Sequence, residues 1–303
     1  MNIKESFAKF NFMDYGRLAQ IASIALCVLS ILFILVRGIN WGLDFTGGTV
    51  VELGYPAPAE LEGIRDGLNE AGYTSAVVQH LGDRSTVLIR LSGTDDVSSD
   101  VLEIVSQDGV DIDLRLAEYI GPQVGQELRE KGGLGMLLAI LMVLIYVSFR
   151  FQLKYALGAI VALVHDVLII LGVFALFQVP FDLSVLAAIM AVIGYSLNDT
   201  IVVSDRIREN LQGTNLDKLV DVINISLRQV FGRTLVTSLT TFFVLVCLFL
   251  FSGDSIRYFA LALMLGVLVG TYSSIYVSSN LLVLLKLERP SEIKQRLEKE
   301  GYN

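Results

Sequence analysis

Cysteine and histidine are scarce in this chain of 303 residues, which has two of each. Cys27 and Cys247 both lie inside uncharged apolar runs, so we expect no disulfide, and they do not reveal the redox compartment. His80 stands alone in a polar region, where a strand or surface histidine is a simpler interpretation than a metal ligand. That region shows no cluster typical of a metal site, a nucleophile paired with a base, or a phosphate loop. We therefore predict a protein that is not an enzyme and holds no cofactor.

Charged residues are also few, at 18%, whereas 53% of residues are apolar and the mean hydropathy is +0.63. These values are typical of an integral membrane protein rather than a soluble domain. The formal charge of −8 is unevenly distributed. Residues 37–133 contain 17 acidic and 7 basic residues, a net charge of −10, and the remainder is slightly basic. The acidity thus belongs to one hydrophilic domain, which argues against a nucleic-acid partner.

Six apolar runs are long enough to cross a bilayer core of about 30 Å. We predict membrane spans at 18–36, 132–149, 155–177, 183–204, 234–253 and 258–285. A cleaved signal peptide is the competing interpretation of the first run. Its apolar part is too long for that, and no small-x-small cleavage site follows it, so we expect a retained span.

Lysine and arginine indicate the orientation, because they are enriched in the short cytoplasmic connections of membrane proteins. The loop at 178–182 has no basic residue and the loop at 252–257 has one. We expect both terminal segments, 1–17 and 287–303, in the cytoplasm and residues 37–131 outside it. The basic residues assigned to the cytoplasmic side are Lys4, Lys9, Arg17, Arg150, Lys154, Arg206, Arg208, Lys218, Arg228, Arg233, Lys286, Arg289, Lys294, Arg296 and Lys299.

The hydrophilic region has the pattern β-α-β-β-α-β, which predicts a ferredoxin-like α+β domain. The expected elements are at 49–53, 59–71, 77–81, 86–91, 97–106 and 111–117, with a hairpin turn at Gly82-Asp83. Residues 43–49 (LDFTGGT) resemble a nucleotide-binding loop only superficially. They precede a strand and lack a lysine, so a tight turn is the better interpretation.

Asp199 is the main candidate for function, because it lies inside the fourth apolar run. A carboxylate costs about 2.5–3.5 kcal/mol there on insertion scales, and such residues normally serve ion or proton movement. A hydrogen bond between helices is the alternative. Arg233 lies immediately before the fifth run and could pair with Asp199 at a similar depth. Thr237, on the same face as Arg233, would extend a polar track; Arg233 as an interface anchor is the other interpretation.

Other polar and small residues within the spans are secondary candidates. His165 and Asp166 lie midway along the third run, and a buried hydrogen bond or a proton role is equally compatible with them. Adjacent helical residues diverge, so we expect one of the two to point elsewhere. Asn198 adjoins Asp199. Gly266 and Gly270 form a small-residue face that permits close helix packing, either against a partner subunit or within the chain.

Four motifs resemble the SecF family, the smaller membrane subunits of bacterial SecD–SecF complexes, within the resistance-nodulation-division superfamily. They are residues 42–49 (GLDFTGGT), 119–125 (YIGPQVG), 193–210 (IGYSLNDTIVVSDRIREN) and 232–238 (GRTLVTS). Six spans with one large loop after the first also fit that family. The resemblance covers essentially the whole chain.

The resemblance implies half of a resistance-nodulation-division bundle in the bacterial inner membrane. It implies SecD, the SecYEG translocon, preproteins and the lipid bilayer as partners. Export would be driven by the proton gradient, and the sequence does not distinguish H⁺ from Na⁺ as the coupling ion. Asp199 would be the proton-relay aspartate, Arg233 its charge partner and Thr237 a polar neighbour. The alternatives are a proton-coupled exporter of small molecules or lipids from the same superfamily, which usually has two halves in one chain, and a scaffold that only stabilises its partner.

Overall fold

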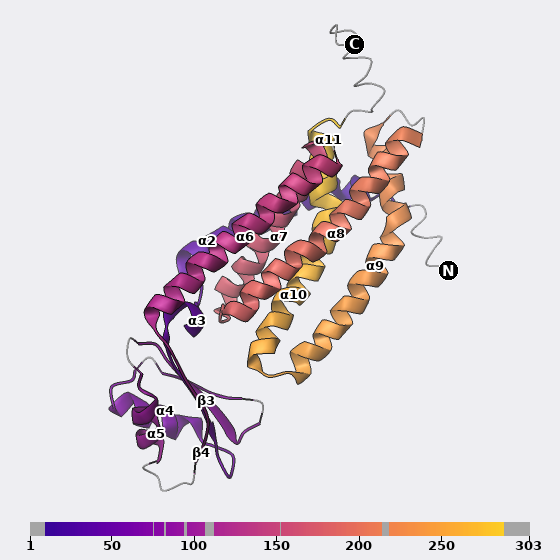
Figure 1. The fold of residues 1–303 in the computed structure, drawn as a ribbon. Coiled ribbons are helices and arrows are strands. Elements are labelled where there is room, and N and C mark those ends of the chain that lie inside the picture. The colour runs from indigo at the N-terminus through magenta and orange to yellow at the C-terminus, as the bar shows by residue number, and fades with distance from the viewer. Residues whose placement is uncertain are drawn as a thin grey trace.

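The computed structural model describes residues 10–74, 76–81, 83–93, 96–106, 112–151, 153–213 and 218–287. Of the predicted features, residues 1–9, Gly82, Asp111 and the tail beyond Leu287 lie outside these ranges. Within them, a bundle of long helices carries a small α/β domain, residues 48–120, at one end (Figure 1). We refer to the end of the bundle beside this domain as the near end and to the opposite end as the far end.

Six helical segments in the described part of the chain are long and apolar enough to cross a membrane, which confirms the predicted class of fold. The first combines a 3₁₀ turn (η1, Phe12–Tyr15) with α2 (Gly16–Arg37). The next four are α6 (Pro122–Arg150), α7 (Leu153–Phe177), α8 (Leu183–Gly213) and α9 (Leu219–Phe251). The sixth consists of α10 (Asp254–Ser273), a π-helical turn (η2, Ser274–Ser278) and α11 (Ser279–Leu284).

Several helices extend beyond the predicted apolar runs. The second spanning helix begins at Pro122 rather than at residue 132, and the fifth at Leu219 rather than at 234. The backbone hydrogen bonds of a helix do not depend on the polarity of its side chains. Hydropathy therefore locates the apolar part of a helix and not its ends.

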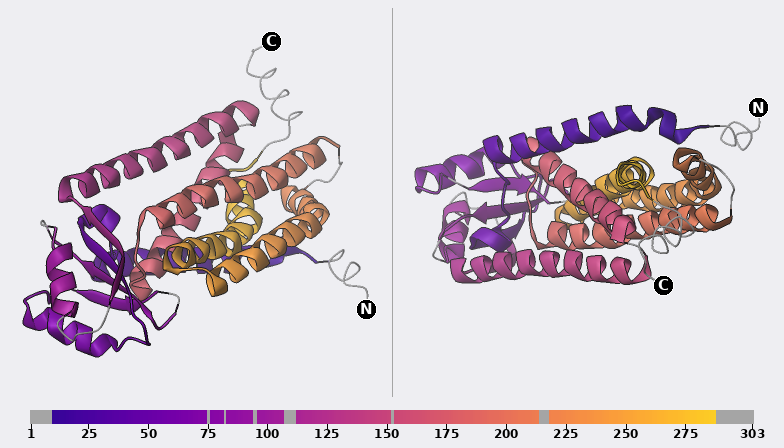
Figure 2. Two further views of the ribbon diagram at one scale, coloured as in Figure 1. Left: turned by 60° about the horizontal axis from the view of Figure 1, so that its bottom comes forward. Right: turned by 90° about the horizontal axis from the view of Figure 1, so that it is seen from above.

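The centre of the bundle is formed by α7, α8 and α10, whose apolar sections are the most buried, and α6 is the least buried. Figure 2 shows α6 along the outside and α2 on another side. Contact between α2 and α7 is tight, because a Cβ atom at Gly172 would overlap Ser30. Polar atoms between these central helices are thus far from lipid.

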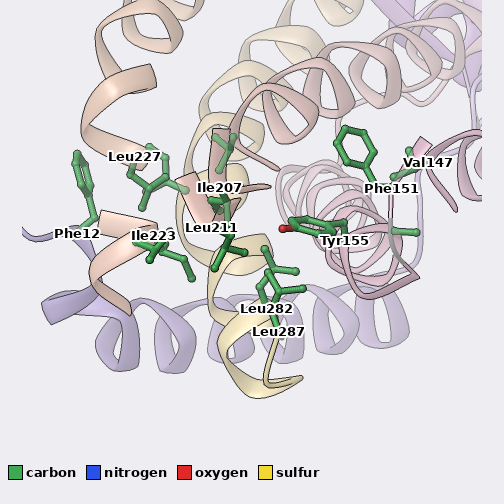
Figure 3. Packing of buried hydrophobic residues seen from close by; sticks show 14 residues of the cluster. Phe12, Val147, Phe151, Tyr155, Ile207, Leu211, Ile223, Leu227, Leu282 and Leu287 are labelled. Carbon is green, nitrogen blue, oxygen red and sulfur yellow. The ribbon is translucent and has the colours of Figure 1, made fainter. Parts of the chain in front are cut away.

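Two apolar clusters close the bundle at its ends. The far cluster includes Tyr155, Ile207 and Ile223 (Figure 3), and the near cluster includes Phe174 and Phe181. Buried polar side chains lie between these clusters. The centre of the bundle is therefore a polar layer with an apolar cluster on either side.

The α/β domain has the order β1 (Gly48–Gly54), α4 (Leu61–Glu70), β2 (Val77–His80), β3 (Thr86–Leu91), α5 (Ser98–Ser106) and β4 (Asp113–Ile120). The sheet order is β2-β3-β1-β4, and all neighbouring strands are antiparallel. This is the predicted ferredoxin-like arrangement. Alternate residues of β1 and β3 point toward α4 and α5, where Val51, Leu53 and Ile89 are fully buried.

Asp83 fixes the turn between β2 and β3. Its Oδ1 accepts hydrogen bonds from the backbone N–H groups of Thr86 (2.8 Å) and Ser85 (3.1 Å). These bonds to Thr86 and Ser85 hold the pKa of the Asp83 carboxyl below its usual value.

Candidate functional site

Polar side chains are buried at mid-height in the bundle, where lipid-facing helices would carry only apolar ones. A carboxylate in this position needs hydrogen bonds or a bound ion to offset its desolvation. The buried residues come from α7, α8, α9, α10 and η2: His165, Asp166, Ser196, Asp199, Thr200, Thr234, Ser238, Ser273 and Ser274.

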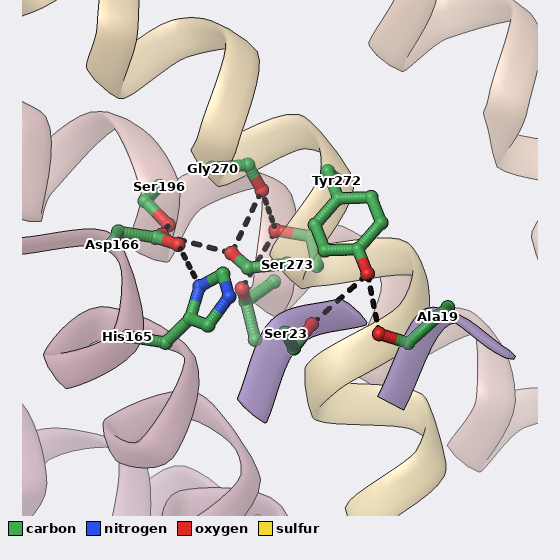
Figure 4. A network of polar contacts seen from close by, with 10 residues as sticks. Ala19, Ser23, His165, Asp166, Ser196, Gly270, Tyr272 and Ser273 are labelled. Carbon is green, nitrogen blue, oxygen red and sulfur yellow. Dashed lines mark hydrogen bonds and ion pairs between the residues drawn. The ribbon is translucent and has the colours of Figure 1, made fainter. Parts of the chain in front are cut away.

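Asp166 is the centre of a hydrogen-bonded network (Figure 4). Its side chain is 0% exposed. Oδ2 accepts hydrogen bonds from the hydroxyl groups of Ser196 (2.6 Å) and Ser273 (2.8 Å), and Oδ1 lies 2.9 Å from His165 Nδ1. Asp166 therefore ties α7 to both α8 and α10.

His165 and Asp166 thus contact each other, and the expectation that one of them points elsewhere is wrong. Their Cα–Cβ bonds diverge along the helix, but the imidazole turns back far enough for Nδ1 to reach the neighbouring carboxylate. The imidazole also stacks on Tyr272, with 6.1 Å between ring centroids. The Tyr272 hydroxyl lies 2.9 Å from Ser23 Oγ and donates a hydrogen bond to the Ala19 carbonyl (2.7 Å). The network therefore reaches α2 as well.

Replacing Asp166 by alanine is expected to destabilise the bundle by roughly 3 kcal/mol or more, because three buried groups lose their shared acceptor. Asp166→Asn keeps one acceptor oxygen and should cost less. Chemical unfolding in detergent micelles would measure both variants. Asp205→Ala is the control, because the Asp205 pair with Arg150 is exposed and 3.7 Å long and should contribute at most about 1 kcal/mol. Equal stability of the Asp166 and Asp205 variants would contradict a structural role for the network.

Small residues of α10 allow this network to form. A Cβ atom at Gly266 would overlap the side chain of Val192, and one at Gly270 would lie 3.1 Å from Ser196 Oγ. Both glycines therefore face α8 within the same chain. Of the two possibilities that the sequence leaves open for this face, the structure supports packing within the chain, because the close approach that small residues permit is already used between α10 and α8.

Asp199 lies beside the network without belonging to it. Its side chain is 5% exposed, and Oδ2 is buried with no hydrogen-bond partner among the described residues. The next residue, Thr200, has its hydroxyl 2.8 Å from that of Ser274. A buried carboxylate oxygen without a partner is a position where a proton or another cation can bind.

The depth of Asp199 relative to α9 follows from two contacts between the antiparallel helices. Tyr195 donates to Ser238 Oγ at 3.5 Å, and toward the far end Asn210 donates to Ser226 Oγ at 2.8 Å. Asp199 lies one turn after Tyr195, and α9 reaches the same depth one turn before Ser238. That position is occupied by Thr234.

The predicted ion pair between Asp199 and Arg233 is absent: among the described residues, no ion pair includes either side chain. Arg233 lies at a similar depth to Asp199, but on the exposed side of α9. Successive helical residues are about 100° apart, so the inward position of Thr234 turns Arg233 away. Thr237 is also exposed, and its hydroxyl donates to carbonyl groups of its own helix, those of Arg233 (3.1 Å) and Thr234 (2.9 Å).

Arg233 lines a groove of about 260 Å³ between α8 and α9. The groove is polar, and Asp205, Arg206 and Glu209 also line it. Val202, another lining residue, is three positions after Asp199 and therefore shares its side of α8. The groove thus ends about one helical turn from the Asp199 carboxylate, on the far side.

The remaining predicted residue, Asn198, is exposed on α8 and does not join the site. Sequence reasoning missed Ser196, Thr234 and Ser238 and treated the serines of the last span mainly as packing residues. The available signal was their spacing: Thr234 and Ser238 are four residues apart, and Ser196 is three residues before Asp199. Intramembrane hydroxyl groups at helical spacing mark one face.

Comparisons with known proteins agree with these features. The family model described as protein export membrane protein SecD/SecF, C-terminal, matches residues 100–288, and the SecD/SecF GG motif matches residues 32–55. Protein translocase subunit SecF of Pseudomonas aeruginosa is 48% identical over 290 residues, which cover 95% of this chain and 94% of that protein. The corresponding subunit of Vibrio alginolyticus is 45% identical over 296 residues, covering 96% and 94%.

Two crystal structures of SecDF have the same fold over 95% of this chain. SecDF of Thermus thermophilus, described as a translocon-associated membrane protein, matches with a TM-score of 0.84 and 36% identity. SecDF in a super-membrane-facing form matches with a TM-score of 0.72 and 35% identity. In both cases this chain spans 40% of the length of the SecDF chain.

Proposed function

Because the chain belongs to the SecF family of protein translocase subunits, we propose that it is one half of a proton-driven motor for preprotein export. The family relationship supports the export role. The coupling role is supported by one observation above the others: Asp199 Oδ2 is buried in a membrane helix and has no partner among the described residues. The polar groove beside Arg233 provides an approach from the far side.

In this proposal Asp199 binds and releases the coupling ion, and the charge change alters how α8 packs against α9. Ionised Asp199 attracts Arg233, so α8 and α9 move relative to each other and the guanidinium turns inward. Protonated Asp199 releases it, and both helices return to the arrangement described above. One proton crossing 100 mV provides about 2.3 kcal/mol. That energy can bias a two-state helix pair, and no covalent chemistry is required.

The proposed partner is SecD, which would supply the part of the complex that this chain lacks. This chain matches 40% of a SecDF chain. Arg233 is exposed on α9, and a charged side chain that faces lipid is costly. Thr237 and Thr240 are exposed on the same side of the helix and donate hydrogen bonds to carbonyl groups of α9. We propose that SecD packs there and that the pair works with the SecYEG translocon. The similarity to translocase subunits favours this function over export of small molecules or lipids.

We further propose that the protein lies in the bacterial inner membrane with both ends in the cytoplasm and the α/β domain outside. A reporter that is active only in the cytoplasm should then work when it is fused after Lys218 and fail when it is fused beside Asp96. Fluorescence of the two fusions in intact cells measures this. Activity of the fusion beside Asp96 would show that the chain has the opposite orientation and that the groove opens toward the outside of the cell.

Ion dependence of export tests the function directly. Inverted membrane vesicles that contain this chain, its SecD partner and the translocon should export a preprotein faster when a pH gradient is imposed without sodium. The gain should vanish with a protonophore and persist with a sodium ionophore. Dependence on a sodium gradient alone would identify Na⁺ as the ion, and no dependence on either gradient would leave only the scaffold alternative.

A further inference from the structure

We infer that Asp44 is a positioning residue that clamps the root of the α/β domain to the first turn of α8, the helix that carries Asp199. Asp44 belongs to a short helix, α3 (Leu43–Thr46), which leads directly into β1. The inference rests on the proposed function, because the clamp would transmit the movement that ion binding causes.

The clamp is a hydrogen bond across a long sequence separation. Asp44 Oδ2 accepts a hydrogen bond from the backbone N–H of Leu183, the first residue of α8, at 2.8 Å. The first N–H groups of a helix have no partners within the helix, and that end carries positive partial charge. A carboxylate from another segment is therefore stabilised there, although the bond is exposed to solvent, by about 0.3–1 kcal/mol, an equilibrium shift of about 2- to 5-fold.

Asp182 caps the same helix end locally. Its Oδ1 accepts hydrogen bonds from the backbone N–H of Val185 (2.9 Å) and the hydroxyl of Ser184 (2.6 Å). Two carboxylates thus bind one helix end, and only Asp44 comes from the root of the α/β domain. Asp182 therefore serves as a matched control.

Backbone hydrogen bonds join the same two segments. Phe181 N–H donates to the Asn40 carbonyl and Gly42 N–H donates to the Phe181 carbonyl, both at 2.8 Å. The rings of Trp41 and Phe45 lie 5.4 and 5.8 Å from that of Phe181. Residues 40–45 and the turn before α8 therefore form one unit.

The other side of this unit holds the sheet. A Cβ atom at Gly125 in α6 would lie 3.0 Å from the Phe45 carbonyl carbon, and one at Gly47 would lie 2.8 Å from Pro122 Cα. Gly48 begins β1 and pairs with Ile120 at the end of β4. The two strands that attach the domain thus leave from the place where α3 is wedged between α6 and α8.

A helix transmits displacement along its axis because its backbone hydrogen bonds keep it stiff. Leu183 and Asp199 lie on the same helix, about 24 Å apart at 1.5 Å per residue. A movement of α8 at Asp199 therefore reaches Leu183 and, through Asp44, the first residues of β1. Asp44 carries no ion in this scheme and acts on the position of the domain alone.

Spin labels test the clamp in the full chain with its SecD partner in vesicles. The labels are attached at Asn69→Cys in the α/β domain and Ser252→Cys in the bundle, with Cys27 and Cys247 replaced by serine. The distance between the labels is measured with and without a pH gradient. In parallel, the pH profile of Asp199 labelling by a carbodiimide, corrected with Asp199→Asn, reports ion binding at Asp199.

The unmodified chain should show a gradient-dependent change in distance, and Asp199→Asn should show none. Asp44→Ala should reduce that change while it keeps the labelling profile. Loss of an exposed hydrogen bond between a carboxylate and a helix N-terminus shifts the clamped equilibrium by about 2- to 5-fold. The Asp182→Ala variant should show the same gradient-dependent change in label distance as the unmodified chain. Asp44→Asn retains an acceptor oxygen and should recover part of the change in label distance. If Asp44→Ala does not assemble, the Asp44→Asn variant is compared with the unmodified chain instead.

Three results would overturn the clamp alone: normal movement in Asp44→Ala, equal loss of movement in Asp182→Ala, and a shifted labelling profile in Asp44→Ala. In each of these three outcomes the Asp199→Asn variant would still show no movement of the domain, so the proposed function would stand. Absence of gradient-dependent movement in the unmodified chain, together with labelling of Asp199 that does not respond to pH, would instead remove the proposed function and the clamp with it.

Discussion

Replacement of Asp199 by asparagine is expected to abolish the gradient-dependent part of preprotein export while the protein remains inserted and bound to its partner. Asparagine has nearly the same shape and can occupy the same buried position. It cannot bind and release a proton, so each cycle loses the roughly 2.3 kcal/mol per proton that a 100 mV potential provides. The export rate in vesicles with and without a pH gradient measures the loss, and the amount of SecD that co-purifies measures assembly.

Two further substitutions serve as comparisons for Asp199→Asn. Arg233→Met should be nearly as severe, since methionine cannot respond to the charge at residue 199. Asp205→Asn should be mild, because Asp205 is exposed and its pair with Arg150 is 3.7 Å long. Normal gradient-dependent export by Asp199→Asn would show that the buried carboxylate is structural and would refute the coupling mechanism.

Replacement of Gly266 by leucine is expected to prevent correct packing of the bundle. Even a Cβ atom at this position would overlap the Val192 side chain of α8. Larger residues in a well-packed interior typically cost about 1–3 kcal/mol through displaced helices. Separation of α10 from α8 would also pull Ser274, the residue that follows α10, away from Thr200 of α8, which breaks a 2.8 Å hydrogen bond and adds to that cost. Yield of monodisperse protein after detergent extraction and the unfolding midpoint are the measurements.

Gly133→Leu is the matched control for this substitution. Gly133 is exposed on α6, and nothing lies within 4 Å of a Cβ atom built there. Its leucine variant should be extracted and should unfold as the unmodified protein does. If Gly266→Leu were equally well behaved and lost only the partner, the small-residue face would have to be an interface between subunits after all.

Features that depend on composition and period alone could be predicted from the sequence. A helix that crosses a bilayer needs a long apolar run whatever its neighbours are, so the six spans were predictable. The order of strand-like and helix-like periodic patterns in residues 48–120 likewise made the ferredoxin-like arrangement predictable. Asp199 was detectable because a charge inside an apolar run is anomalous before any packing is known.

Features that depend on rotation about a helix axis could not be predicted. Arg233 and Thr234 are adjacent in sequence and lie at about the same depth, yet one side chain faces outward and the other faces inward. About 100° separates them, and only the packing of α9 against α8 decides which one turns in. The same applies to His165, whose ring orientation depends on Tyr272 and Asp166.

The π-helical turn at Ser274–Ser278 has a consequence for chain length in the family. A π-helical turn contains one more residue than an α-helical turn. Removing a residue elsewhere in the last span would rotate everything after it by about 100° and move buried Leu282 off its neighbours. Removing one within Ser274–Ser278 would restore a regular α-helix and leave Leu282 in place. Relatives that are one residue shorter in this stretch are therefore expected to keep the same contacts with an unbroken helix, so a length difference is tolerated here.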